Sequence, residues 1–223
     1  MSVLTNLNNI KENINKACTK VNRDPKEINI IGVTKYVSIE RTQELLDTGI
    51  YNLGENRAEE LVHKYNELDS RAKFHFIGTL QSRKVKDVVD KVTSIHSLDR
   101  LSVAKQINSR SKDIKDCFIQ VNVSEEDSKH GLKIDEVDEF INQLSQYEKV
   151  RIVGLMTMAP HIDDDKEIRS VFKRLATLRN SIREKKIPYA PCEYLSMGMS
   201  NDYEIAIEEG ATHIRLGSKL VGN

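Results

Sequence analysis

The sequence has no tryptophan, few other aromatic residues and only three cysteines. Because aromatics make up 5% of the 223 residues, the hydrophobic core must be built mainly from aliphatic side chains. Cys18, Cys117 and Cys192 are widely spaced and odd in number, which suits reduced thiols better than a disulfide framework or a zinc site. We therefore predict no structural metal and no disulfide.

An excess of charge of either sign is also missing, since Lys+Arg and Asp+Glu are balanced at 34 each. This neutrality argues against nucleic acid and against an anionic membrane surface as partners. No segment approaches the roughly 18 apolar residues of a membrane span, and the N-terminus lacks the pattern of a signal peptide. We expect a soluble, cytoplasmic protein with no membrane partner.

Short apolar segments that favour strands alternate with segments of helical periodicity along the whole chain. The strand candidates are residues 28–35, 51–53, 73–77, 92–95, 116–123, 150–155, 193–195 and 212–216. The helix candidates are residues 4–22, 40–47, 57–67, 81–90, 99–109, 134–144, 166–185 and 202–208.

Eight strand candidates with helices between them predict an α/β fold, a closed (β/α)8 barrel of the TIM type. Linkers, repeats and low-complexity tracts are absent, so we expect residues 1–223 to form one domain. No room remains after Gly217 for a full eighth helix, and we expect the extra N-terminal helix to complete the outer ring. The alternative is an open, doubly wound sheet.

Lys35 ends the first strand candidate, Ile28–Lys35, which is otherwise apolar and β-branched. A buried ammonium is costly to desolvate, but a lysine amine that points into a cleft can form a Schiff base with an aldehyde. The alternative is that Lys35 only marks where the strand reaches solvent. In barrels of this kind the carboxyl ends of the strands surround the active site, which favours the first interpretation.

Two glycine-bearing segments follow the last two strand candidates, Ser196–Ser200 and Arg215–Ser218. The loops after strands 7 and 8 frequently bind phosphate in barrels. We expect Ser200 or Asn201 to cap the following helix, and Gly217 to let the backbone approach a ligand. Each glycine turn alone indicates only a turn, whereas the two together, opposite a lysine, predict an anion site.

A lysine and a phosphate pocket together suggest pyridoxal 5'-phosphate (PLP), a phosphorylated aldehyde that proteins hold as a Schiff base. Arg215 would then reach the pyridine nitrogen. A guanidinium only donates hydrogen bonds, so it would keep that nitrogen unprotonated and weaken the ring as an electron sink. The alternative is that Arg215 points outward and pairs with Glu208 or Glu209.

At these residues the chain resembles the pyridoxal-phosphate homeostasis protein family, which is related to the N-terminal barrel of bacterial alanine racemase. The matching motifs span nearly the whole chain in order. They are V-T-K at 33–35, G-E-N at 54–56, H-F-I-G-x-L-Q-x-x-K at 75–84, Q-V-N at 120–122 with Glu126, Lys129 and Gly131, G-L-M-T-M at 154–158, L-S-M-G-M-S-x-D at 195–202 and I-R-L-G-S at 214–218.

The resemblance implies a single-domain, fold-type III PLP barrel that resembles the N-terminal domain of alanine racemase. It implies that Lys35 forms the internal aldimine and that Arg215 faces the pyridine nitrogen. Further positions are implied as cofactor-binding: Asn56 at the ring, and Met199, Ser200, Gly217 and Ser218 at the phosphate.

Three functions are compatible with these residues. The first is a PLP-binding protein in vitamin B6 homeostasis that buffers the cofactor, delivers it to PLP-requiring apo-enzymes and has no established turnover. The second is an amino-acid racemase, which needs a second acid/base opposite the lysine. In alanine racemases this second acid/base is a tyrosine from a second domain. This chain ends seven residues after Leu216 and offers only Tyr36 and Tyr51 near the mouth. The third is a Schiff-base aldolase acting on a phosphorylated sugar. The first is favoured.

Two histidines remain as weaker candidates. His75 alternates with Phe74 and Phe76, which predicts a side chain inside the barrel. His161 lies beside Asp163–Asp165, where we expect a solvated loop rather than a cation site.

The second domain of the racemases supplies their dimer contact, and its absence leads us to expect a monomer.

Overall fold

The computed structural model describes residues 2–126 and 130–222. Within them, eight parallel strands close into a barrel in sequence order, β1 to β8, which confirms the predicted fold and excludes the open sheet. The strands are β1 (Asn29–Val33), β2 (Asn52–Glu55), β3 (Lys73–Phe76), β4 (Val92–Leu98), β5 (Lys115–Gln120), β6 (Val150–Met156), β7 (Tyr194–Ser196) and β8 (His213–Leu216).

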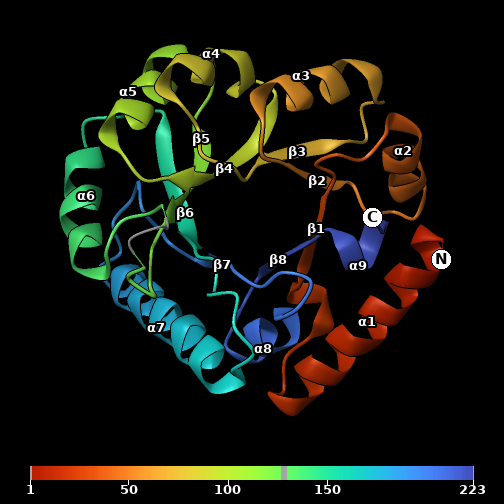
Figure 1. Ribbon diagram of the computed structural model, residues 1–223. Coiled ribbons are helices and arrows are strands. Elements are labelled where there is room, and N and C mark those ends of the chain that lie inside the picture. The colour runs from red at the N-terminus through yellow and green to blue at the C-terminus, as the bar shows by residue number, and fades with distance from the viewer. Residues whose placement is uncertain (1, 127–129, 223) are drawn as a thin grey trace.

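Helices surround the strands as a ring (Figure 1). They are α1 (Val3–Lys20), α2 (Ile39–Asp47), α3 (Ala58–Glu67), α4 (Val85–Val88), α5 (Leu101–Arg110), α6 (Val137–Leu144), α7 (Asp165–Glu184), α8 (Tyr203–Glu208) and α9 (Ser218–Val221). Three 3-10 turns complete the elements: η1 (Pro25–Glu27), η2 (Ser82–Lys84) and η3 (Ile134–Glu136).

The N-terminal helix α1 closes this ring, as predicted. It lies between α8 and α2, with α9 beside it (Figure 1). The Asn13 amide donates to the Tyr203 hydroxyl of α8 at 3.0 Å, and the Glu44 carboxylate of α2 accepts from the Val3 amide at 3.0 Å. A full-length helix after β8 is therefore replaced by a helix from the other end of the sequence.

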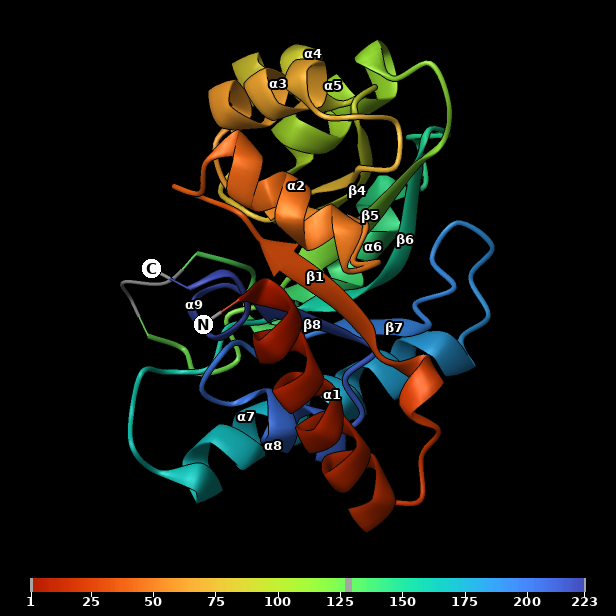
Figure 2. The ribbon, with the colours of Figure 1, turned by 90° about the vertical axis from the view of Figure 1, so that its right-hand side faces the viewer.

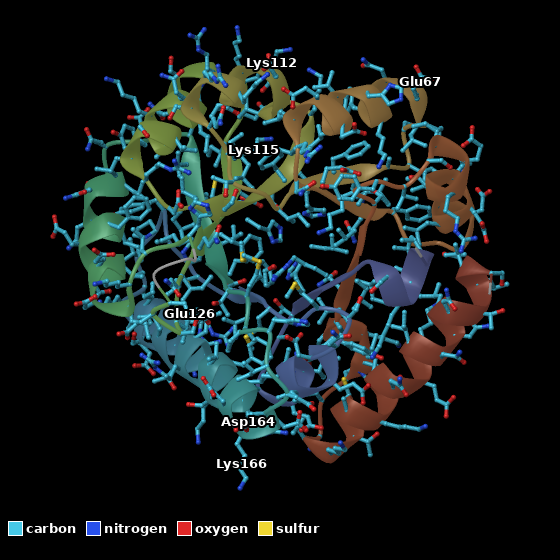
Figure 3. The ribbon with its side chains drawn as sticks, in the orientation of Figure 1. Glu67, Lys112, Lys115, Glu126, Asp164 and Lys166 are labelled. Carbon is cyan, nitrogen blue, oxygen red and sulfur yellow. The ribbon has the colours of Figure 1, made fainter. Side chains whose placement is uncertain are left out.

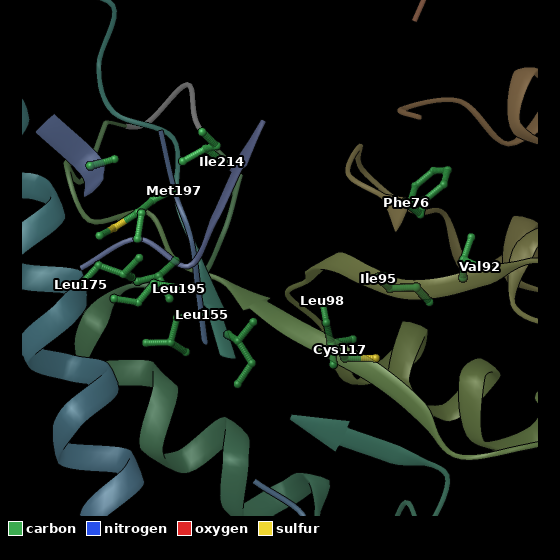
Figure 4. Close-up of a cluster of buried hydrophobic side chains, with 14 of the residues drawn as sticks. Phe76, Val92, Ile95, Leu98, Cys117, Leu155, Leu175, Leu195, Met197 and Ile214 are labelled. Atoms are coloured by element: carbon green, nitrogen blue, oxygen red, sulfur yellow. The ribbon is translucent and has the colours of Figure 1, made fainter. Parts of the chain in front are cut away.

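The main hydrophobic core fills the space between the strands and the helices. Figure 4 shows part of it, where Leu155 and Leu195 of neighbouring strands lie close to Leu175 of α7. Charged side chains such as Glu67, Lys112 and Lys166 lie at the outer edge of the ring (Figure 3). Burying aliphatic side chains contributes roughly 25 cal/mol for each Å² removed from water, so this layer holds the barrel together.

The carboxyl ends of all the strands meet at one end of the barrel, because the strands are parallel. In the side view, β1 runs toward the side where α9 lies (Figure 2). The loops that carry the sequence-predicted site residues are on this side. We call it the mouth of the barrel.

Candidate functional site

A cavity of about 1110 Å³ opens at the mouth. A volume of this size is sufficient for a small-molecule ligand. Its lining includes every residue that the sequence singled out as cofactor-binding: Lys35, Asn56, Met199, Ser200, Arg215, Gly217 and Ser218. Lysine and arginine occur in the lining at Lys35, Arg41 and Arg215, and its acidic residue is Asp202. The cavity therefore favours an anionic ligand.

Lys35 lies beyond the end of β1 and not within it, which corrects the predicted strand 28–35. The strand ends at Val33, and the amide of Val37 donates to the carbonyl of Thr34 at 3.0 Å to close a tight turn. Tyr36 occupies the left-handed region of this turn with φ 63°, a conformation that costs a non-glycine residue energy. The turn leaves Lys35 exposed in the cavity, so no burial cost is attached to its amine.

A buried ion pair lies behind this turn. The Lys64 ammonium of α3 donates to the Glu55 carboxylate at 2.7 Å and to the Thr34 carbonyl, and the Thr34 hydroxyl donates to the same Glu55 oxygen at 2.5 Å. Lys64 and Glu55 are 1% and 0% exposed. Because Thr34 precedes Lys35, the pair fixes the backbone from which the cavity lysine extends.

Arg215 extends from β8 into the barrel, so the outward ion pair considered from the sequence is wrong. Its guanidinium donates to the Ser196 hydroxyl oxygen at 2.8 Å and to the Thr157 carbonyl at 2.9 Å. Burial lowers its pKa to about 10, which still leaves it cationic at neutral pH. Glu208 and Glu209 pair instead with Arg169 of α7, at 2.6 and 2.7 Å.

The loop after β7 has a tightly folded backbone. The Met199 amide donates to the Asp202 carboxylate at 2.5 Å, and Gly198 takes a φ of 91°. A Cβ at Gly198 would lie 2.6 Å from the Cβ of Ala206, so only glycine fits. Burial raises the pKa of Asp202.

The capping predicted for the following helix is wrong. The helix begins at Tyr203 with Asp202 as its N-cap residue, and no side chain caps it. Ser200 and Asn201 lie in the preceding turn, because the bond from Met199 to Asp202 moves the helix start onward. The Ser200 hydroxyl oxygen lies 3.5 Å from the backbone nitrogen of Lys219, which brings the loops after β7 and β8 together.

Gly217 and Gly78 differ in the space that a side chain would find at each position. A Cβ at Gly217 would meet nothing closer than Val33 at 3.6 Å, an ordinary contact. A Cβ at Gly78 would lie 2.3 Å from the carbonyl oxygen of Asn56. Protein packing therefore requires glycine at Gly78, whereas at Gly217 the protein itself leaves space for a side chain at the cavity wall.

Of the other residues considered from the sequence, Tyr36 and His161 line the cavity, whereas His75 and Tyr51 do not. His75 is inside the barrel, as predicted, but below the cavity lining. Tyr51 precedes β2 and so lies at the opposite end from the mouth, whereas Tyr36 lines the cavity. No group of three or more metal-ligating side chains occurs in the described ranges, including the region of His161. Lys129 lies outside the described residues.

The three cysteines are buried and unpaired, as predicted from their spacing. Burial raises the pKa of the Cys117 thiol above its ordinary range and that of Cys192 to about 12. In the described part of the chain, no helix combines the length and apolar character needed to cross a bilayer.

The fold and the cavity define a β/α barrel with a ligand site at the carboxyl ends of its strands. The model of the alanine racemase N-terminal domain matches residues 5–223, and the chain belongs to this family. The resemblance predicted from the motifs is thereby confirmed.

Curated relatives of similar length include two named pyridoxal phosphate homeostasis protein. The one from Aquifex aeolicus is 37% identical, with 100% of this chain and 98% of that protein covered. The one from Escherichia coli K12 is 32% identical, with 97% of this chain and 94% of that protein covered.

Solved structures support the same fold. PipY of Synechococcus elongatus, described with PLP bound, matches with a TM-score of 0.86 and 27% identity, and covers 99% of this chain and 100% of that one. An alanine racemase of Clostridium difficile matches with a TM-score of 0.76 and 15% identity. The match covers 98% of this chain and 56% of the racemase chain. The racemase likeness shows the fold alone.

Proposed function

We propose that this chain binds PLP in the cavity, with Lys35 as the residue that forms a Schiff base to it, and acts in PLP homeostasis. The observation that carries the proposal is the convergence of Lys35, Arg215 and the loops after β7 and β8 on one cavity. The names of relatives at 37% and 32% identity support the homeostatic role, and the PLP described in PipY supports the cofactor.

The residues present fit this group. An aldehyde needs an accessible amine, and Lys35 supplies one at the mouth. A phosphate dianion needs hydrogen-bond donors and space at the backbone, which the hydroxyls of Ser200 and Ser218 and the open side of Gly217 provide. A pyridine nitrogen accepts one hydrogen bond, and Arg215 is a donor that cannot accept one.

Bound PLP supplies an electrophilic aldehyde and an electron-accepting ring. The amine of Lys35 would hold the aldehyde end of PLP. Arg215 would donate toward the ring nitrogen and disfavour its protonation, and the ring would then be a weaker electron sink. That chemistry suits a protein that holds PLP and releases it to apo-enzymes.

The visible absorption of the protein mixed with PLP tests this proposal. After unbound PLP, which is itself yellow, has been removed by gel filtration, we expect the wild type to keep a yellow band and Lys35→Ala to keep none. Lys219→Ala is the matched control, because Lys219 is exposed and lies next to Ser218 but does not line the cavity. A wild type that takes up no PLP would contradict the cofactor proposal and favour the aldolase alternative.

A racemase would differ in one respect, the loss of the α-proton of alanine. Exchange of that proton with solvent, followed by NMR in deuterated water, is expected to be absent for the PLP-loaded protein. Exchange with conversion of L- to D-alanine would replace the homeostatic role with the racemase.

A further inference from the structure

A chain of buried polar side chains starts at Arg215 and crosses the barrel. The Ser196 hydroxyl oxygen accepts from Arg215 at 2.8 Å and lies 2.8 Å from Nδ1 of His96. Ser196 belongs to β7 and His96 to β4, which are not neighbours in the closed barrel. Their hydrogen bond therefore spans the interior.

The chain continues from His96 toward the opposite end of the barrel. His96 Nε2 lies 2.8 Å from the Ser94 hydroxyl oxygen, which lies 2.7 Å from His75 Nδ1. His75 Nε2 lies 3.1 Å from Oδ1 of Asn52 at the start of β2. His96 is 0% exposed, and Ser94 and His75 are 4% and 5% exposed. We call these residues, from Arg215 to Asn52, the interior relay.

Both imidazoles are neutral at physiological pH. Burial lowers the pKa of His75 to about 3 and holds that of His96 well below its ordinary value. The groups that face them are also basic: His213 faces both, Lys73 faces His75 and Arg215 faces His96. A neutral imidazole has one donor and one acceptor nitrogen. Each ring therefore donates a hydrogen bond from one nitrogen and accepts one at the other.

The donor and acceptor of each hydrogen bond in the interior relay can be assigned by starting from Asn52. The Asn52 oxygen only accepts, so His75 donates from Nε2 and must accept at Nδ1. The Ser94 proton goes to His75 Nδ1, and His96 Nε2 lies 2.8 Å from the Ser94 oxygen and 3.3 Å from His75 Nδ1. Neither of these atoms offers a proton to His96, so His96 donates from Nε2 and accepts at Nδ1.

The Ser196 proton then goes to His96 Nδ1. Ser196 is left as a pure acceptor for the guanidinium of Arg215. Every bond thus points from Arg215 toward Asn52.

We propose that His96 and His75 are positioning residues for Arg215, because the interior relay takes up the Ser196 proton and so turns the lone pairs of the Ser196 oxygen toward the guanidinium in the cavity. The proposal rests on the proposed function for the ligand that Arg215 meets. Two of the guanidinium's five N–H donors bind the described protein acceptors Ser196 and Thr157, which leaves donors for a ligand.

The tautomers of the two histidines test the relay without any ligand. Long-range proton–nitrogen NMR of the apo-protein is expected to show His75 and His96 both protonated at Nε2, with no titration between pH 5.5 and 8. Protonation of His96 at Nδ1 would overturn the proposal, because the Ser196 proton would then have no acceptor in the interior relay.

A pair of equal-sized substitutions tests the effect on the ligand. His96→Leu removes the acceptor for the Ser196 proton, whereas His96→Asn, of the same size, restores an acceptor near the position of Nδ1. We expect His96→Leu to weaken PLP binding at least tenfold and shift its absorption band. We expect His96→Asn to stay within threefold of the wild type.

His213→Leu is the matched control. His213 and His96 both pack against Phe118, with ring centroids 5.3 and 4.1 Å away, but His213 bonds to the Thr212 hydroxyl, outside the relay. We expect its PLP affinity to stay within threefold of wild type.

Equal losses in His96→Leu and His96→Asn would mean that His96 contributes packing only and would overturn the proposal. If His96→Leu does not fold, the tautomers of His75 and His96 in the wild type still test the proposal. A wild type that takes up no PLP, with both tautomers as expected, would contradict the proposed function but leave the relay intact.

Discussion

Two glycines at the mouth serve different purposes, although both look alike in the sequence. Gly78 is required by the backbone of Asn56, at 2.3 Å from its missing Cβ, whereas Gly217 has ordinary clearance from the protein. The absence of a side chain at Gly217 therefore matters only to what occupies the cavity that it lines.

We predict that Gly217→Ala loses less stability than Gly78→Ala, because its Cβ meets only ordinary contacts. We also predict that it weakens PLP binding at least tenfold, because the new methyl group occupies the ligand's space. Urea unfolding and a PLP titration measure the two effects. Gly78→Ala is the comparison and is expected to lose stability as well, by about 1–3 kcal/mol from overpacking. Unchanged PLP affinity in Gly217→Ala would contradict the assignment of Gly217 to the phosphate.

Residues at strand ends and the inward direction of His75 could be predicted from the sequence, whereas the polar contacts inside the barrel could not. Lys35 and Arg215 follow or end apolar segments, and the parallel fold brings all such ends together. The prediction ended the fourth strand at Ile95, but β4 continues to Leu98. His96 and Ser97 follow Ile95 and are polar, whereas barrel interiors are usually aliphatic. Here the interior also holds polar side chains, so the strand continues through them.

At the scale of elements, α3 is joined to β1 and β2 by the Glu55–Lys64 pair. Nothing in the sequence predicts this pair, since the two residues belong to different elements and each alone reads as a surface charge. One Glu55 oxygen, Oε2, has no hydrogen-bond partner within the described residues. The carboxylate therefore depends on Lys64 and Thr34 for its stabilisation.

We predict that Lys64→Met destabilises the protein by about 3–5 kcal/mol, because it leaves the Glu55 carboxylate buried without a counter-charge. The double variant Lys64→Met/Glu55→Gln is expected to recover part of that loss, since it buries no charge. Urea unfolding of both variants and the wild type measures the difference. A double variant less stable than Lys64→Met would show that the pair does not act as a unit.

At the scale of the whole molecule, neutral histidines in the barrel link its stability to pH. The pKa of His75 is lowered to about 3 by burial, against about 6.5 in an unfolded chain. The unfolded chain therefore binds a proton below pH 6.5 that the folded protein does not. Stability from this group is fully present above pH 6.5 and is lost as the pH falls toward 3.

We predict that the free energy of unfolding falls by about 2 kcal/mol for His75 alone between pH 7 and pH 5. This window lies above the ordinary range of the carboxylates, so histidines dominate the change. Urea unfolding at the two pH values measures it, and His75→Asn is expected to show a smaller fall than wild type. Equal stability of the wild type at pH 7 and pH 5 would contradict a neutral, buried His75.

The barrel, the closing role of α1 and the location of the site at the mouth could all be predicted from the sequence. Alternating strands and helices determine the ring, and α1 fills the place in it that a longer helix after β8 would take. The helix start at Tyr203, the turn at Tyr36 and the interior relay could not be predicted. Each depends on hydrogen bonds between residues that come together only in the folded chain.

The most direct test of the proposed function is to trap the lysine that reacts with PLP. The protein is mixed with one equivalent of PLP, reduced with borohydride, digested and mapped by mass spectrometry. We predict one phosphopyridoxyl group on Lys35 in the wild type and none at any single site in Lys35→Ala. A label on another lysine, or labels spread over many surface lysines in the wild type, would contradict Lys35 as the residue that holds the cofactor.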